Sequence, residues 1–320
     1  MTTQPTSLPE LWMAGPLAPD LIAQIETRYR VHRGWTIDDP AAYLREHGAA
    51  IRGIATSGRF GATRERMAQL PALEAIISYG VGYDPIDIDA AKALGLQVSN
   101  TPGVLDDCVA DTALALMLAV SRRICEADRF VRSGAWPTTG FGLGQRMSGK
   151  RCGIVGLGNI GLQIARRAEG FGMQVAYHNR RARPDAPAHY RYVADLVTLA
   201  RESDYLVLVV PGGAATRHMI DAEVLAALGQ QAYIINVARG TVVDETALVE
   251  ALQAGRIAGA GLDVFEHEPQ VPEALFAMDN VVLLPHIASG THETRQAMAD
   301  LFLANLDGWF DERRLVTPVF

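Results

Sequence analysis

Short apolar runs alternate with segments of helical spacing over residues 10–100. The apolar runs predict β-strands at residues 11–14, 29–31, 51–55, 73–77 and 96–99. Helical spacing of apolar residues between them predicts helices at residues 19–28, 40–47, 63–70 and 85–94. Several of these segments begin with proline, which is favoured in the first turn of a helix. This succession of strand and helix indicates right-handed crossovers and a parallel sheet.

A long helical pattern separates this region from a second alternation. Residues 106–132 are expected to form one helix that bridges two domains, followed by a loop over residues 133–148. Further strands are predicted at residues 152–155, 173–178, 205–210, 233–237, 257–263 and 281–285, with helices beginning near residues 160, 195, 221 and 244. Several of these strands are almost wholly apolar, as strands covered on both faces are. We expect a doubly wound sheet of at least five or six strands.

The last helical segment, residues 293–312, carries Met298, Phe302, Leu306 and Trp309 on one face. We expect this helix to fold back onto the N-terminal domain, so that the chain crosses between its domains twice. The fold class is therefore α/β, with two doubly wound parallel-sheet domains.

Composition narrows the classes of function. The chain has 320 residues, of which 49% are hydrophobic, a net charge of -7 and a pI near 5.6, so it offers no basic surface for nucleic acid or an anionic membrane. No signal peptide is recognised, and the longest apolar run, residues 113–120, is too short to span a bilayer. We expect a cytoplasmic protein without a metal, whose Cys108, Cys125 and Cys152 are buried small hydrophobes.

Residues 150–167 combine an apolar strand, a turn with three glycines and a helix. Gly156 permits the tight turn, Gly158 lets the backbone approach a pyrophosphate, and Gly161 lets the helix pack close to the strand. The unpaired amides at the helix N-terminus, around Asn159 and Ile160, then meet the phosphate oxygens. Such a turn can also be purely structural, but its position between strand and helix favours dinucleotide binding.

The end of the next strand predicts which dinucleotide is bound. The chain reads Tyr177-His178-Asn179-Arg180-Arg181 at about 20 residues beyond the glycines, where a carboxylate would otherwise bind the adenosine ribose. No acid stands in these five residues to repel a 2′-phosphate, and Arg180 and Arg181 could pair with one. NADP(H) is therefore the preferred cofactor, with NAD(H) also allowed. The alternative is a solvated loop.

Two strand exits of the first sheet could contact a ligand, because open parallel sheets bind ligands beyond the carboxyl ends of their strands. Gly80 and Gly82 bare the backbone of one loop, so the amides of Val81 and Gly82 could converge on a small anion. A glycine-rich strand exit without a ligand is the alternative. Arg59, in the other loop, could bind a carboxylate, although a lone loop arginine is more often solvated.

Three polar residues stand near the carboxyl ends of later strands: Arg239, Glu268 and His286. By the same rule, all three could face a cleft between the domains. An arginine can bind a carboxylate and polarise a carbonyl, a histidine can transfer the hydroxyl proton, and a carboxylate beside the histidine holds its tautomer and favours its charged form. Singly, each residue could instead be structural or solvated.

Five motifs in this order resemble the D-2-hydroxyacid dehydrogenases, and within them the glyoxylate/hydroxypyruvate and hydroxyphenylpyruvate reductases. The motifs are GVGYD at 80–84, GIVGLGNIG at 153–161, NVARG at 236–240, GLDVFEHEP at 261–269 and PHIASGT at 285–291. The resemblance implies a flavodoxin-like substrate domain, residues 1–102 with 288–320. It also implies a Rossmann-like NAD(P)-binding domain, residues 103–287, and usually a homodimer.

The resemblance also implies roles for single residues. Arg239 would bind the substrate carboxylate and carbonyl, His286 would donate and accept the proton, and Glu268 would be its partner. The amides of Val81 and Gly82 would hold the carboxylate. Further residues implied near the cofactor are Val210, Pro211, Val237, Ala238, Asp263, Ala288 and Ser289. His267 does not align with the catalytic histidine and is treated as a bystander.

A member of this family would reduce a small 2-oxo acid, such as glyoxylate or hydroxypyruvate, to the D-2-hydroxy acid by hydride transfer. One alternative is a dinucleotide-sensing dimeric binding protein like the corepressor relatives, against which the complete Arg239, Glu268 and His286 set argues. Another is a formate or phosphite dehydrogenase on the same scaffold. The substrate side chain depends on the conformations of loops around residues 57–60, 136–141 and 291–294.

Overall fold

The computed structural model describes residues 8–320, which divide into two compact units. The first unit comprises residues 8–105 and 292–320, and the second comprises residues 106–291. The predicted domains divide the chain at residues 102 and 287 instead. Each unit is built on a parallel sheet, which confirms the predicted fold class.

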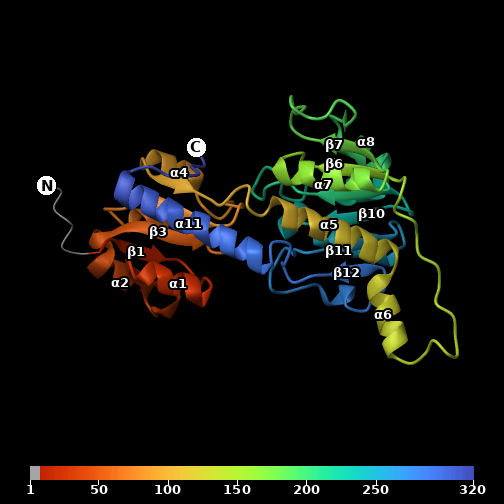
Figure 1. Ribbon diagram of the computed structural model, residues 1–320, viewed down its shortest axis with the longest axis horizontal. Helices are drawn as coiled ribbons and strands as arrows, with labels where there is room; N and C mark the ends of the chain where they lie inside the picture. Colours follow the sequence, from red (N-terminus) through yellow and green to blue (C-terminus); the bar gives the residue numbers. More distant parts are fainter. Residues whose placement is uncertain (1–7) are drawn as a thin grey trace. The chain divides into compact units, whose positions relative to one another are not determined.

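The first unit has a five-stranded parallel sheet in the order β2-β1-β3-β4-β5. Figure 1 draws this unit in red to orange, apart from its last helix, which is blue. Its strands are β1 (Glu10–Met13), β2 (Arg30–Arg33), β3 (Ile51–Ser57), β4 (Ala75–Tyr79) and β5 (Gln97–Ser99). Its helices are α1 (Pro19–Glu26), α2 (Pro40–His47), α3 (Arg64–Ala68), α4 (Ile88–Ala93) and α11 (His292–Glu312), with short 3-10 turns at Gly34–Thr36 and Gly48–Ala50. Proline begins α1 and α2, as the sequence predicts.

The last helix belongs to the first unit, as predicted. On α11, Phe302 and Leu306 are fully buried in one core cluster with Leu11 and Ile77 of the sheet. The burial of these side chains stabilises the packing of α11 on the sheet, because removing apolar area from water is favourable.

The second unit has a seven-stranded parallel sheet in the order β12-β11-β10-β9-β6-β7-β8. Its strands are β6 (Arg151–Val155), β7 (Gln174–His178), β8 (Arg191–Tyr192), β9 (Tyr205–Leu208), β10 (Tyr233–Asn236), β11 (Gly259–Leu262) and β12 (Val281–Leu283). Its helices are α5 (Asp106–Ser121), α6 (Ile124–Arg132), α7 (Asn159–Gly170), α8 (Leu196–Arg201), α9 (Ala222–Leu228) and α10 (Glu245–Gln253), with 3-10 turns at Gly240–Val242 and Glu273–Leu275. The strand that the sequence did not predict is β8, whose two residues are too few to show a period.

The single helix predicted over residues 106–132 is wrong, because the chain breaks between α5 and α6. Arg123 has φ 54°, in the left-handed region, which ends the hydrogen-bond ladder of α5. Its guanidinium binds both carboxylate oxygens of Glu126 and lies over the ring of Phe141, at 4.7 Å from the centroid. The apolar period continues across the break and therefore did not reveal it.

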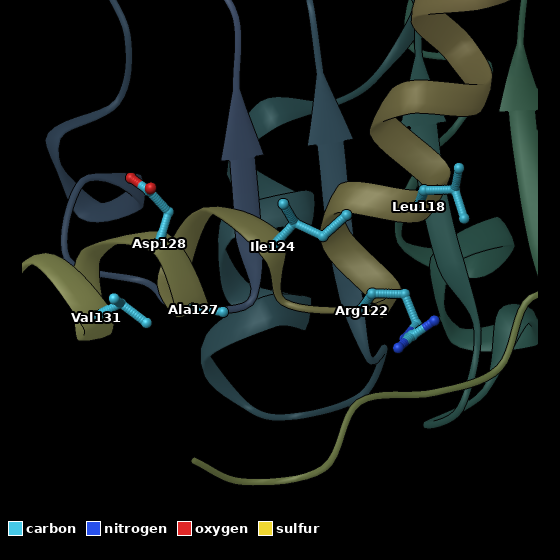
Figure 2. A pocket seen from close by; sticks show the side chains of 6 residues that line it. All are labelled: Leu118, Arg122, Ile124, Ala127, Asp128 and Val131. Carbon is cyan, nitrogen blue, oxygen red and sulfur yellow. The ribbon is translucent and has the colours of Figure 1, made fainter. Parts of the chain in front are cut away.

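The face of α6 carries exposed apolar side chains. A surface hollow of about 520 Å³ lies along α6 and the end of α5 (Figure 2). It is lined by Leu118, Arg122, Ile124, Ala127, Asp128 and Val131. Ile124 and Val131 are 50% and 52% exposed, and in the loop that follows α6 Leu143 is 97% exposed.

The cysteines differ from the expectation that all three are buried. Cys152, on β6, is buried, and burial raises the pKa of its thiol to about 12. Cys108 is partly buried, whereas Cys125 is exposed because it lies on α6, none of whose residues is buried.

Two kinds of feature are absent from residues 8–320. In this part of the chain, no helix combines the length and the hydropathy that crossing a bilayer requires. In the same residues, no group of three or more His, Cys, Asp or Glu is arranged to hold a metal ion.

Candidate active site

The glycine turn after β6 is shaped by close contacts at two of its three glycines. Gly156 has φ 103°, and a Cβ there would lie 2.8 Å from Val210 Cγ1. A Cβ on Gly161 would lie 2.2 Å from the Gly156 carbonyl oxygen, so that glycine permits α7 to pack against the turn. A Cβ on Gly158 would meet nothing within 4 Å. Gly158 therefore borders open space, which the proposed approach of a pyrophosphate requires.

The N-terminus of α7 can receive an anionic group. The helix begins at Asn159, and its N-cap Gly158 has no side chain that could cap the first turn. The Gly158 amide already donates to the Gly156 carbonyl, at 2.9 Å. The next amides, of Asn159 and Ile160, have no carbonyl four residues before them within the helix, and they carry the positive end of its dipole.

Of the three residues that follow β7, Asn179 supports the glycine turn, whereas Arg180 and Arg181 are exposed to solvent. Asn179 Oδ1 accepts a hydrogen bond from the Leu157 amide at 2.7 Å, so Asn179 holds the glycine turn. Arg180 and Arg181 are exposed, and within residues 8–320 neither guanidinium forms a hydrogen bond or an ion pair. Two unpaired cations beside the glycine turn suit a ligand with an additional phosphate.

A third arginine in this loop, Arg183, was missed by the sequence analysis. Its guanidinium donates to Asp185 at 2.8 and 2.9 Å and to the Leu157 carbonyl at 3.2 Å. Asp185 lies four residues beyond Arg181, and the hydrogen bonds from Arg183 lower the pKa of Asp185, so its carboxylate is ionised and its charge is balanced by Arg183. The sequence signal that could have identified Arg183 is its position as a third arginine, two residues after Arg181.

Arg239 follows β10 in a turn that is fixed from within. Asn236, 1% exposed, accepts from the Ala238 amide and donates to the Arg239 carbonyl, each at 3.0 Å. The next residue, Gly240, touches the chain beyond β11, because a Cβ there would lie 1.8 Å from the Phe265 carbonyl carbon. The turn therefore brings Arg239, which is half-buried, to the segment that carries Glu268.

Glu268 and His286 form a hydrogen-bonded pair. His286 Nδ1 lies 2.7 Å from Glu268 Oε2, and the other oxygen of Glu268 accepts from the Phe265 amide at 3.1 Å. Burial alone would raise the pKa of Glu268, but the hydrogen bonds from His286 and the Phe265 amide, together with the charge of Arg239, lower it. The carboxylate is thus held ionised, and Arg239, Glu268 and His286 lie together.

Asp263 holds the backbone on either side of His286. His286 has φ 55°, a left-handed conformation that costs free energy in a residue with a Cβ. Its amide donates to the Asp263 carbonyl at 2.8 Å. The amides of Ile287 and Ala288 donate to the two oxygens of the Asp263 carboxylate at 2.7 and 2.9 Å. Burial raises the pKa of Asp263, and these amides oppose that shift.

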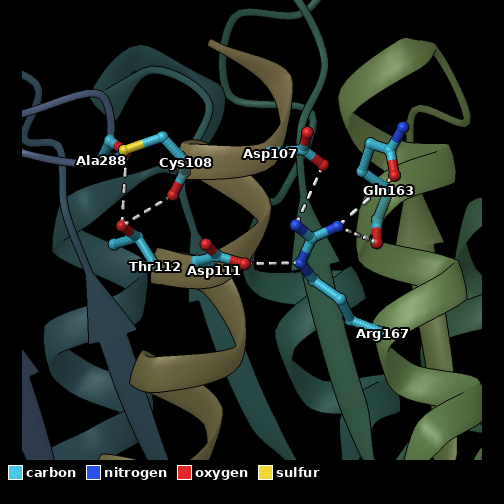
Figure 3. A network of polar contacts seen from close by, with 7 residues as sticks. All are labelled: Asp107, Cys108, Asp111, Thr112, Gln163, Arg167 and Ala288. Atoms are coloured by element: carbon cyan, nitrogen blue, oxygen red, sulfur yellow. Dashed lines mark hydrogen bonds and ion pairs between the residues drawn. The ribbon is translucent and has the colours of Figure 1, made fainter. Parts of the chain in front are cut away.

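Helix α5 also forms a hydrogen bond with the segment after His286 (Figure 3). Thr112 Oγ1 donates to the Ala288 carbonyl, at 3.3 Å, and is also within 3.1 Å of the Cys108 carbonyl. On the opposite side of α5, Arg167 of α7 pairs with Asp107 and Asp111 at 3.0 and 2.6 Å. Sequence reasoning missed Thr112, since a contact across 176 residues leaves no local pattern.

The other residues predicted near the cofactor lie beyond the carboxyl ends of strands of the seven-stranded sheet. Val210 and Pro211 follow β9, and Val237 and Ala238, which are buried, follow β10. Ser289 is half-buried after the Asp263-bound turn. That these residues and Asp263 contact a cofactor stays a prediction.

The loop that carries Val81 and Gly82 belongs to the first unit. Both residues are half-buried, and their amides donate no hydrogen bond within residues 8–320. Gly80 has φ 127°, a conformation that favours glycine. The two amides are therefore available to an anion.

These residues fit a dinucleotide and a proton-transfer step. The glycine turn, the N-terminus of α7 and the arginines after β7 supply the open space and the positive charge that such a cofactor needs. His286 Nε2 is the nitrogen not bound to Glu268, so it can exchange a proton with a ligand oxygen.

Comparison with known proteins agrees with this arrangement. Residues 114–288 match the family model described as D-isomer specific 2-hydroxyacid dehydrogenase, NAD binding domain. The chain is 46% identical to glyoxylate/hydroxypyruvate reductase A of Arabidopsis thaliana over 307 residues, covering 96% of this chain and 97% of the relative. It is equally identical, with the same coverage, to hydroxyphenylpyruvate reductase of Plectranthus scutellarioides.

Solved structures match over almost the whole chain. One is the NADPH-dependent glyoxylate/hydroxypyruvate reductase of Sinorhizobium meliloti in complex with NADP and malonate. It is 43% identical with a TM-score of 0.91, and the match covers 98% of this chain and 97% of that one.

Proposed function

The chain belongs to the D-isomer specific 2-hydroxyacid dehydrogenases, and on this premise we propose that it reduces glyoxylate, hydroxypyruvate or a similarly small 2-oxo acid with NADPH. The resemblance seen in the five motifs is confirmed. The protein is an NAD(P)-dependent oxidoreductase that acts on CH–OH donors and their 2-oxo acids. The observation that carries the proposal is the His286–Glu268 pair beside Arg239.

The three side chains have separate tasks. A reduced nicotinamide, when bound by the glycine turn and α7, supplies a hydride for the keto carbon. Arg239 binds the substrate and stabilises the negative charge that develops on the keto oxygen, and His286 donates its Nε2 proton to that oxygen. Glu268 keeps the imidazole oriented and balances its charge.

The substrate carboxylate is assigned to the amides of Val81 and Gly82. Their lack of partners within the described residues supports this assignment. Hydrogen bonds from two backbone amides are directional, so they orient the carboxylate as well as attract its charge. The orientation of the carboxylate then fixes the position of the keto carbon bonded to it.

NADPH is assigned as the preferred cofactor because of Arg180 and Arg181. Their exposed, unpaired guanidiniums in the described residues support an interaction with a 2′-phosphate. Arg183 assists by holding Leu157 of the glycine turn and by neutralising Asp185.

The test is a spectrophotometric assay of NADPH and NADH oxidation with glyoxylate, hydroxypyruvate, phenylpyruvate and 2-oxobutyrate. Reduction of glyoxylate or hydroxypyruvate with NADPH, faster than with NADH, is the expected result. Absence of turnover with every 2-oxo acid would instead favour the dinucleotide-sensing binding protein. Activity only in the direction of NADP reduction, with formate or phosphite, would identify the other alternative.

The partner is assigned as a second copy of this chain. In Figure 1, α6 and the loop after it extend away from the seven-stranded sheet. Trp136 and Leu143, in that loop, are 66% and 97% exposed, and the hollow along α6 is lined partly by Ile124 and Val131 (Figure 2). A projection with exposed apolar side chains and a partly apolar hollow on one chain suit a two-fold interface in which each covers the other.

A further inference from the structure

Asn100 lies directly after β5 and contacts the loop that carries Val81 and Gly82. Its side chain is buried, with 8% of the residue exposed. Its Nδ2 donates a hydrogen bond to the Val81 carbonyl at 2.8 Å.

The bond to the Val81 carbonyl fixes the direction of an amide. The carbonyl of Val81 and the N–H of Gly82 belong to the same peptide group, which is planar and trans, so the two bonds point in opposite directions. When Asn100 holds the carbonyl on its own side, the Gly82 N–H must face away from Asn100. Without that bond, the peptide could rotate and turn its carbonyl oxygen toward the anion.

The rest of the loop is held next to the same strand end. The Gly80 amide donates to Thr101 Oγ1, and the Thr101 amide donates to the Gly80 carbonyl, each at 3.0 Å. Thr101 is fully buried. Asn100 and Thr101 therefore fix successive peptide groups of the loop.

Asn100 is itself anchored by the C-terminal segment. Thr317 Oγ1 donates to the Asn100 carbonyl at 2.6 Å. Asn305 of α11, fully buried, accepts from the amides of Val316 and Thr317 at 3.0 Å each and donates to Thr317 Oγ1 at 2.9 Å. Farther along, the Val319 amide donates to the Val98 carbonyl of β5.

We propose that Asn100 is a positioning residue for the substrate carboxylate: it holds the Val81–Gly82 peptide with the Gly82 amide directed at the anion. This inference rests on the proposed function, in which those amides bind the carboxylate. Because Asn100 acts through the loop backbone, its loss weakens carboxylate binding and leaves hydride and proton transfer intact.

The test compares Asn100→Ala with Asn280→Ala. Asn280 is a matched control, because its Nδ2 also donates to a backbone carbonyl, that of Ala258 at 3.2 Å, away from the loop. In Asn100→Ala the KM for hydroxypyruvate is expected to rise about fivefold to tenfold, the factor that one hydrogen bond typically contributes. The kcat and the KM for NADPH are expected to stay within about twofold, because uniform binding affects KM alone. In Asn280→Ala none of these constants is expected to change.

Asn100→Asp provides a second variant of the same shape if the alanine variant fails to fold. Its carboxylate cannot donate to the Val81 carbonyl, so the same rise in KM is expected. Calorimetric titration with oxamate, a non-reducible analogue of glyoxylate, measures carboxylate binding without turnover in the NADPH-loaded protein. The affinity for oxamate is expected to fall by the same factor as KM rises.

Each outcome separates this inference from the proposed function. If the wild type reduces 2-oxo acids and Asn100→Ala, or Asn100→Asp in its place, keeps the wild-type KM, Asn100 has no positioning role and the function stands. If the wild type reduces none of them, the proposed function is wrong, and oxamate titration still decides the inference. Equal oxamate affinity in wild type and variant, or no binding to the wild type, would overturn it.

Discussion

His286 Nδ1 lies 2.7 Å from Glu268 Oε2, and this contact assigns the protons of the imidazole. An ionised carboxylate can only accept, so Nδ1 carries a proton and Nε2 is the nitrogen left for substrate. The backbone of His286 is strained, with φ 55°, and is held by Asp263. Restraint of both the ring and the backbone suits the proposed transfer of a proton from His286 to a substrate oxygen.

Replacing His286 by alanine is expected to remove most of the turnover. Because general acid catalysis typically contributes a factor of roughly 100 to 10000, kcat for hydroxypyruvate reduction should fall within that range. NADPH binding, measured by fluorescence titration, should stay nearly unchanged. His267→Ala, one residue from Glu268, is the matched control and should keep full turnover. Equal kcat in His286→Ala and wild type would refute the assignment.

Glu268→Gln is expected to alter how stability depends on pH. The pKa of Glu268 is lower in the folded protein than in the unfolded chain, so its ionised form stabilises the fold. That contribution is fully present above the unfolded pKa of about 4.3 and is lost as pH falls through the lower folded pKa. The Tm difference between wild type and Glu268→Gln should therefore be constant near neutral pH and shrink in acid. Glu312→Gln, at an exposed carboxylate at the end of α11, serves as the control. A Tm difference that grows in acid would contradict the pairing.

Replacing Arg180 and Arg181 together by serine is expected to weaken NADPH binding selectively. Hydrogen bonds to charged groups contribute about 1.5–3 kcal/mol, so the KM for NADPH should rise roughly 10-fold to 100-fold. The KM for NADH, which lacks the 2′-phosphate, should change little. Arg201→Ser, on the exposed end of α8, serves as the control. An unchanged preference for NADPH would show that other residues select the cofactor.

Asp263→Asn is expected to disturb the turn around His286. An asparagine accepts with one oxygen only, so one of the two amides bound by Asp263 would lose its partner. An unsatisfied buried amide costs about 1–3 kcal/mol, which should appear as a lower Tm, and the looser turn should lower kcat. Asp204→Asn removes a comparable bond, to the Arg151 amide, and should lower Tm without lowering kcat. Wild-type kcat in Asp263→Asn would separate the turn from catalysis.

Leu143→Ser is expected to weaken a dimer. The side chain is 97% exposed in the single chain, so the substitution should not lower the Tm of a monomer. Analytical ultracentrifugation over a concentration series should show wild-type dimers and a shift toward monomers in the variant. Phe276→Ser, at another exposed apolar residue, is the control. A wild type that stays monomeric at micromolar concentration would exclude this interface.

The part of the candidate site that lies in the second unit could be predicted largely because its residues follow strands of one parallel sheet. The exits of β6, β10 and the segment beyond β11 are marked by glycines and polar residues within a few positions of apolar runs. Because neighbouring strands end at the same edge of the sheet, the strand order predicts that residues after β11 and β12 lie close together. Glu268 and His286, 18 residues apart in the sequence, are indeed hydrogen-bonded.

The residues that escaped prediction act through contacts distant in sequence. Arg183 reaches Leu157 across 26 residues, and Thr112 reaches Ala288 across 176. The break at Arg123 also escaped, because its left-handed backbone is held by Glu126 and by Phe141, and the apolar period runs on regardless. Side-chain hydrogen bonds and ring contacts of this kind do not change the spacing of apolar residues, so the sequence pattern does not reveal them.

The contact at Gly240 limits how this enzyme can be redesigned. A single added carbon there would collide with the Phe265 carbonyl and push the arginine turn from the chain that carries Glu268. A library aimed at bulkier acids can diversify the loops at residues 57–60, 136–141 and 291–294 but must leave position 240 untouched, since even alanine would move Arg239, the proposed substrate-binding residue, away from Glu268.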